Sequence, residues 1–106
     1  MSGGSNSYIP SSSENAGRPC EKLAITVILA TPAINISVLV KAKDALEIVY
    51  VNPALEAHDR NGEYVGTILS TSNLKIIDCI KEGVEFQGIV QSLNGSKCSI
   101  LIKAVV

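Results

Sequence analysis

The chain has 106 residues, a length that indicates a single small domain. Hydrophobic residues make up 46% of it but aromatic residues only 4%, so its core must be built from aliphatic side chains. The net charge of −1 excludes a broadly basic surface and leaves nucleic-acid binding, which draws on clustered Lys and Arg, to a local patch.

The N-terminal stretch, residues 1–19, consists almost entirely of Ser, Gly, Asn and Pro: MSGGSNSYIPSSSENAGRP. Such a segment cannot bury enough apolar surface to offset the entropy cost of ordering its backbone, about 1–2 kcal/mol per residue. We therefore expect a flexible tail over residues 1–21 and a single domain over residues 22–106.

Residues 23–40, LAITVILATPAINISVLV, contain no charged side chain and raise the question of a membrane span. Nine of these eighteen positions are β-branched and Pro32 lies near the middle, which disfavours a helix and favours strands. Leu23–Ala30 is an apolar run of strand length, and residues 34–42 alternate between apolar and polar. We predict two strands broken at Thr31-Pro32. A signal peptide would need a short basic start, whereas residues 1–22, of mixed character, precede this run. We therefore expect no membrane association and a cytoplasmic location.

The middle of the chain continues this pattern. Ala45–Val51 alternates like a half-buried strand and ends at Asn52-Pro53, because proline cannot donate to a strand ladder. Asn61-Gly62 is a strong turn signal, and Glu63–Leu69 leaves it as a strand. Whether Leu55–Arg60 pairs across that turn stays open. The inward face of the first of these strands carries Leu46, Ile48 and Tyr50.

One short helix is predicted in the second half of the chain. Ser70-Thr71-Ser72 offers N-caps for a helix that runs to Glu82, and Gly83 is placed to cap its C-terminus. Its expected apolar stripe consists of Leu74, Ile77 and Ile80.

The C-terminal part reads as two further strands. Val84–Ser92 alternates, Asn94-Gly95 turns the chain back, and a last strand follows. The inward face of this last strand is expected to carry Cys98, Ile100, Ile102, Ala104 and Val106. Short antiparallel strands with one helix are typical of small barrels, because closure removes exposed edges. We therefore predict a mainly β fold: a small SH3/OB-like antiparallel β-barrel of about six strands, with one short α-helix over about residues 72–82.

The three cysteines, Cys20, Cys79 and Cys98, show no metal-binding spacing. We interpret Cys79 and Cys98 as small buried hydrophobes, and the odd count argues mildly against a secreted disulfide scaffold. No metal site and no cofactor are predicted.

Catalysis is not expected either. His58 is the sole histidine, and we interpret His58-Asp59-Arg60 as a solvated turn. The glycines are scattered and form no phosphate-binding loop; Gly66 and Gly88, inside strands, are expected to mark bulges or sharp bends. The chain is therefore predicted not to be an enzyme.

For nucleic-acid binding, small barrels use aromatic stacking beside a basic groove. The candidate aromatics, Tyr50, Tyr64 and Phe86, fall on faces assigned to the core. Basic side chains that could form a modest rim are Lys41, Lys43 and Lys97; an ordinary solubilising surface is the alternative interpretation.

The order of pieces over residues 34–106 resembles the HIRAN domain, a small β-barrel fused to DNA-remodelling helicases and also found alone in bacteria. Ile36–Lys43 resembles the family's first strand, and Asp44–Ile48 its acidic residue and second strand. Asn61–Ile68 is similar to its glycine-containing turn and strand, Leu74–Glu82 to its helix, and Phe86–Val90 to the strand that follows.

The resemblance implies that the domain binds the 3′ end of single-stranded DNA. Asp44 falls where the family's acidic loop residue contacts the terminal hydroxyl, and a carboxylate is a suitable acceptor for that group. The chain lacks the Asn-Pro-Tyr part of the family's loop, since Lys41-Ala42-Lys43 runs straight to Asp44.

Two functions are therefore expected in this order. The first is a non-catalytic HIRAN-like module that binds single-stranded DNA or DNA ends through Lys41, Lys43, Asp44 and Lys97. The second is a protein-interaction or homo-oligomerisation module that uses an apolar strand edge, Leu23–Ala30 or Ala104–Val106, and binds no nucleic acid.

Overall fold

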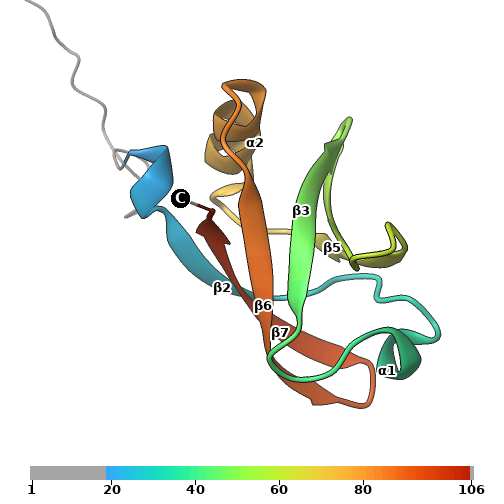
Figure 1. Ribbon diagram of the computed structural model, residues 1–106. Helices are drawn as coiled ribbons and strands as arrows, with labels where there is room; N and C mark the ends of the chain where they lie inside the picture. The colour runs from blue at the N-terminus through green and yellow to red at the C-terminus, as the bar shows by residue number, and fades with distance from the viewer. Residues whose placement is uncertain (1–18, 106) are drawn as a thin grey trace, which may run out of the picture.

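A computed structural model describes residues 19–105 of the chain. Six antiparallel strands form one sheet that curls into a half-barrel, and a helix packs against it (Figure 1). The mainly β prediction is thus confirmed. In chain order the elements are η1 (Cys20–Lys22), β2 (Ala24–Ile28), α1 (Ile36–Leu39), β3 (Ala45–Val51), β4 (Ala54–His58), β5 (Tyr64–Ile68), α2 (Asn73–Lys81), β6 (Phe86–Asn94) and β7 (Lys97–Ala104).

The strand order in the sheet is β2-β7-β6-β3-β4-β5. The pairing left open by the sequence exists: β4 pairs with β5, with a register shift between Ala57 and His58. Beyond β2, Ala30 forms an isolated bridge with Thr67 of β5, and each backbone N–H donates to the other's carbonyl at 2.8 Å. A further hydrogen bond runs from the Ala33 N–H to the Val65 carbonyl at 2.9 Å, so the segment after β2 is hydrogen-bonded to β5.

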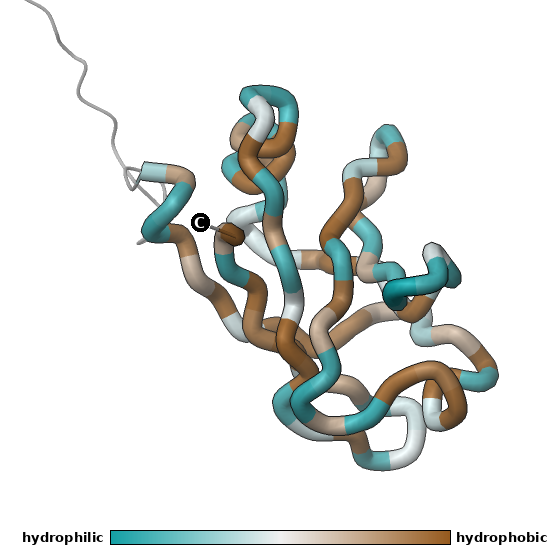
Figure 2. Tube along the Cα trace, viewed as in Figure 1, coloured by the Kyte–Doolittle hydropathy of each residue, from teal (hydrophilic) through white to brown (hydrophobic). Residues whose placement is uncertain are grey.

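The core is aliphatic, as its composition predicts, with Phe86 as its buried aromatic residue. Figure 2 shows hydrophobic residues alternating with hydrophilic ones along the strands. The inward faces predicted for β3, β6 and β7 are confirmed at their buried positions, while Val106 lies outside the described residues. These positions are Leu46, Ile48, Phe86, Gly88, Val90, Cys98, Ile100, Ile102 and Ala104.

The strand predicted over residues 34–42 is wrong: this segment contains the short helix α1. Ile36 and Val40, one helical turn apart, are buried, whereas Val38 is 82% exposed. A run of apolar residues at even positions satisfies both a period of two and the i, i+4 spacing of a helix. The alternation was therefore compatible with either structure, and packing selected the helix.

The helix α2 lies where it was predicted, and Gly83 follows it with a positive φ of 98°. The predicted stripe is only partly right, because Ile77 is buried but Leu74 is 77% exposed. The face that packs on the core is instead formed by Ile76, Ile77 and Cys79. Compared with the predicted stripe, the buried face is shifted so that Cys79 points towards η1, where it is bonded to Cys20.

Cys20 of η1 and Cys79 of α2 form a disulfide across a sequence separation of 59 residues. Cys79 and Cys98 are both buried, as interpreted, but Cys79 is disulfide-bonded rather than simply a small hydrophobe, whereas Cys98 is free. The predicted tail, 1–21, overlaps η1 at Cys20 and Glu21, and its residues 1–18 lie outside the described part. The bond ties the start of the domain to the helix that packs against the half-barrel.

Within residues 19–105, no helix combines the length and the apolar character that crossing a membrane would require.

Candidate functional site

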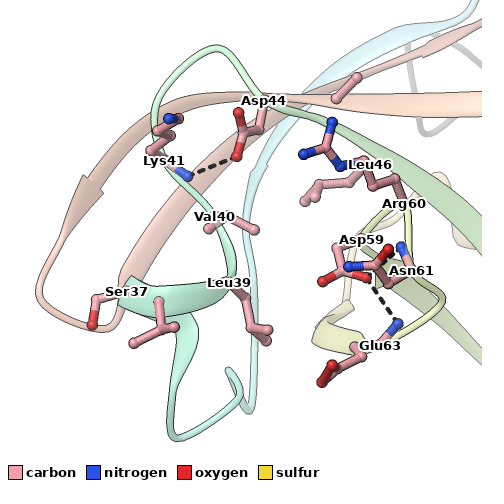
Figure 3. A pocket seen from close by; sticks show the side chains of 12 residues that line it. Ser37, Leu39, Val40, Lys41, Asp44, Leu46, Asp59, Arg60, Asn61 and Glu63 are labelled. Carbon is pink, nitrogen blue, oxygen red and sulfur yellow. Dashed lines mark hydrogen bonds between the residues drawn. The ribbon is translucent and has the colours of Figure 1, made fainter.

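A groove with a volume of about 780 Å³ lies between the segment from α1 to β3 and the turn that joins β4 to β5 (Figure 3). Its apolar part comes from α1, the residue that follows it, and β3, and its polar part from the two facing turns. The residues that line it include Val38, Val40, Lys41, Asp44, Leu46, Asp59, Arg60 and Glu63.

One wall of the groove is the turn Lys41–Asp44. The Asp44 carboxylate accepts a hydrogen bond from the backbone N–H of Lys41 at 3.0 Å. The Asp44 backbone N–H donates to the Lys41 carbonyl at 3.1 Å, which closes the turn. Lys43, with a positive φ of 78°, donates its backbone N–H to Val90 of β6 at 2.7 Å. Two of the predicted site residues, Lys41 and Asp44, therefore line the groove, and Lys43 belongs to the same turn.

The opposite wall is the turn 59–63, which is organised by Asp59. One oxygen, Oδ1, accepts from the backbone N–H groups of Asn61 and Glu63, both at 2.9 Å. Asp59 is 8% exposed, so the prediction of a solvated turn is wrong for this residue. In an Asx turn of this kind a side-chain oxygen, instead of a backbone carbonyl, accepts from the backbone N–H groups and so fixes the loop.

Arg60 is a groove residue that sequence reasoning missed. It is exposed, and Figure 3 shows its side chain extending from the turn towards the wall that carries Asp44. Within residues 19–105, the one ion pair closer than 4.0 Å joins His58 and Glu56, so Arg60 and Asp44 face the groove without a mutual salt bridge. An arginine next to a turn signal gives no sequence indication that it faces a cavity.

Lys97 does not line this groove. It opens β7 at the end of the hairpin with β6, where it pairs with Asn94. The structure therefore divides the predicted set: Lys41 and Asp44 are groove residues, Lys43 is their neighbour, and Lys97 is separate.

His58 also differs from its prediction. It ends β4 rather than lying in a solvated turn, and it is only partly exposed. Its Nε2 atom lies 2.8 Å from Oε1 of Glu56, and its ring makes an edge contact with Tyr64. In the described part of the chain, no cluster of three His, Cys, Asp or Glu side chains has an arrangement suited to a metal ion.

No aromatic residue is found among the described residues that line the groove. Phe86 is buried as expected, whereas Tyr50 and Tyr64 are only partly buried. The Tyr64 hydroxyl donates to the carbonyl of Thr31 at 2.6 Å, and the Tyr50 hydroxyl donates to the Asn52 side chain at 2.8 Å. The groove thus offers charge and an apolar floor but no stacking surface.

Comparison of the chain with protein-family models, with curated proteins and with solved structures finds no match in any of the three.

Proposed function

We propose that this domain is a non-catalytic, HIRAN-like binding module whose groove accepts the 3′ end of a single DNA strand. The observation that carries the proposal is that Lys41 and Asp44, two of the residues selected from the sequence, line one groove of about 780 Å³. Lys43 lies on the same turn and adds a second exposed cation.

The chemistry of the first wall suits a strand end. In the described residues the Asp44 carboxylate uses Oδ2 to hold its turn, which leaves Oδ1 to accept from a terminal hydroxyl. Lys41 and Lys43 supply positive charge for the preceding phosphates. Without an aromatic platform, binding should be weak, sensitive to salt and independent of the base.

The order of elements gives further support, with one exception. The strand β5, the helix α2 and the strand β6 follow one another as the resemblance requires. The segment Ile36–Lys43, however, corresponds to α1 and a turn rather than to the family's first strand. The finer proposal of a closed SH3/OB-like barrel is supported by the Ala30–Thr67 bridge, and slow amide exchange at both residues would test it.

Fluorescence anisotropy with short 5′-labelled single strands that end in a 3′ hydroxyl, at low salt, tests the function. We expect saturable binding that Asp44→Asn weakens, since the amide oxygen can hold the turn but is a weaker acceptor than a carboxylate for the terminal hydroxyl. Lys103→Ala, on an exposed residue of β7 outside the groove, is the control. No anisotropy change at tens of micromolar protein would reject this function.

A second candidate function, self-association or protein binding through a strand edge, is favoured by β2. This strand, AITVI, pairs only with β7 and carries no charge that would oppose pairing with another chain. The second edge predicted for this role was Ala104–Val106. This prediction is wrong for Ala104, because β7 lies between β2 and β6 and Ala104 pairs with Phe86. A mass in light scattering that rises with concentration, and falls when Thr26 is replaced by Lys, would support this function; a constant monomer mass would reject it.

The cytoplasmic location predicted from the sequence is part of this proposal, but the Cys20–Cys79 disulfide weighs against it. Disulfides are rare in compartments that keep thiols reduced. Alkylation of source cells lysed directly in urea, followed by mass measurement, separates the two: three modified cysteines support a reducing compartment, and one, Cys98, supports an oxidising compartment.

A further inference from the structure

The wall opposite Asp44 contains a built element that sequence reasoning did not select. Asp59 is 8% exposed, and its carboxylate accepts from two backbone N–H groups and so fixes the turn 59–63. In addition, the backbone N–H groups of Asp59 and Gly62 donate to the carbonyls of Glu63 and Asp59, respectively, both at 2.9 Å. Arg60 is therefore presented from a rigid turn rather than from a mobile loop.

Arg60 lines the groove without forming a close ion pair with another described residue. Asp44 lines the same groove, yet in the described residues no carboxylate lies within 4.0 Å of the Arg60 guanidinium. In Figure 3 the carboxylate of Glu63 is directed away from Asp44 and Arg60, and Asp59 is engaged in its own turn. Leu46 and Val40 lie between the two walls and are 2% and 4% exposed, so they form a fixed apolar base beneath the polar groups of the two turns.

We infer that Arg60 is the anion-binding residue of this groove and that the ligand carries a phosphate and a hydroxyl together. A guanidinium presents a planar fork of N–H donors that fits two phosphate oxygens, whereas a carboxylate such as Asp44 accepts from a hydroxyl. A nucleoside monophosphate unit has both groups. This inference rests on the proposed function for the source of that unit, a strand end, but a free nucleotide has the same chemistry.

Asp59 acts on the ligand only through Arg60 and is a positioning residue. Asp59→Asn keeps a carbonyl oxygen that can accept from the turn, so it should retain binding. Asp59→Ala loses both hydrogen bonds and should weaken binding even in preparations whose thermal unfolding shows a folded domain. A role confined to stability would not produce this separation.

The test compares Arg60→Ala, Arg60→Lys and the control Lys103→Ala, which removes the same charge outside the groove. Probes are a 5′-labelled ten-residue thymidine strand with a 3′ hydroxyl, followed by anisotropy, and free thymidine 5′-monophosphate, followed by the NMR shift of the Arg60 Nε–H group. We expect Arg60→Ala to weaken binding about tenfold or more, Arg60→Lys to lose part of it, and Lys103→Ala to change it less than about twofold.

The outcomes separate the two proposals. If thymidine monophosphate shifts the Arg60 signal but no strand binds, the inference holds for a free nucleotide and the proposed strand-end function fails. If the strand binds and Arg60→Ala behaves like Lys103→Ala, the inference is overturned while the function stands. If neither probe binds, both are overturned.

Discussion

Leu29 occupies the space in front of Gly66: a Cβ atom on Gly66 would lie 2.8 Å from the Leu29 Cβ atom and 3.0 Å from its Cδ1 atom. Leu29 directly precedes Ala30, whose bridge to Thr67 links the two outer strands. The absence of a side chain at Gly66 therefore allows the segment that carries Leu29 and Ala30 to pack closely against β5. Gly66 was expected to mark a bulge or a sharp bend, and the register of β4 and β5 does shift next to the pair that Gly66 forms with Ala57.

Replacement of Gly66 by Ala should cost more stability than replacement of Gly88. At Gly88 the new methyl group would meet Cδ1 atoms of Ile100 at 2.8 Å and Ile48 at 3.2 Å, which are side-chain ends that can turn away. At Gly66 it meets a Cβ atom, which moves only with the backbone. We expect losses of about 2–3 kcal/mol for Gly66→Ala and about 1 kcal/mol for Gly88→Ala, measured by urea unfolding. Equal losses would contradict the close contact with Leu29.

The helix α1 can be tested against the strand that the alternation predicts. A strand would place Ile36 and Val38 on the same face, whereas the helix buries Ile36 at 2% exposure and leaves Val38 82% exposed. Ile36→Ala should therefore destabilise the domain by about 2–4 kcal/mol. Val38→Ala should change the free energy of unfolding by less than about 0.5 kcal/mol. Similar losses for both variants would favour the strand.

Removal of the disulfide should lower stability substantially. The Cys20–Cys79 bond closes a loop with a sequence separation of 59 residues, and the chain-entropy estimate for such a loop is about 4 kcal/mol. Cys20→Ser is the suitable variant, because Cys20 is partly exposed whereas Cys79 is buried. Unfolding of the wild type with and without reductant should show the same loss, and reductant should leave the variant unchanged.

The free thiol of Cys98 should be unreactive in the folded chain. Burial raises the pKa of the Cys98 thiol, because a thiolate is poorly solvated there. The unfolded chain then releases this proton at a lower pH than the folded chain does. The contribution of the Cys98 thiol to the free energy of unfolding is therefore complete at neutral pH and is lost as the pH rises above about 8.5. Cys98→Ala should remove this part of the alkaline destabilisation. A thiol reagent should react slowly with the native chain and with one thiol per chain in urea.

The strands were predictable where one face is buried. Ile100 and Ile102 in β7, and Phe86 and Val90 in β6, alternate strictly because a sheet with one covered face requires it. The segment after Pro32 was not predictable, since the spacing of Ile36 and Val40 fits a helix as well as a strand. The disulfide was also invisible, because three cysteines allow several pairings and the spacing does not choose among them.

The candidate site shows the same division. Asp44 and Lys41 could be selected because they are close in sequence and form one turn. Arg60 could not, since its place opposite Asp44 depends on the pairing of β3 with β4 and on the burial of Asp59. Long-range pairing determines which turns face each other, and residue spacing alone does not record it.

Glu21–Ala24 and Lys103–Val105 line one shared cavity, which places the first and last described segments side by side. In Figure 1 this junction lies on the left, at η1, whereas α1 lies at the lower right. Adjacent ends of this kind allow the described part of the fold to be joined into a surface loop of a host chain through two neighbouring connections.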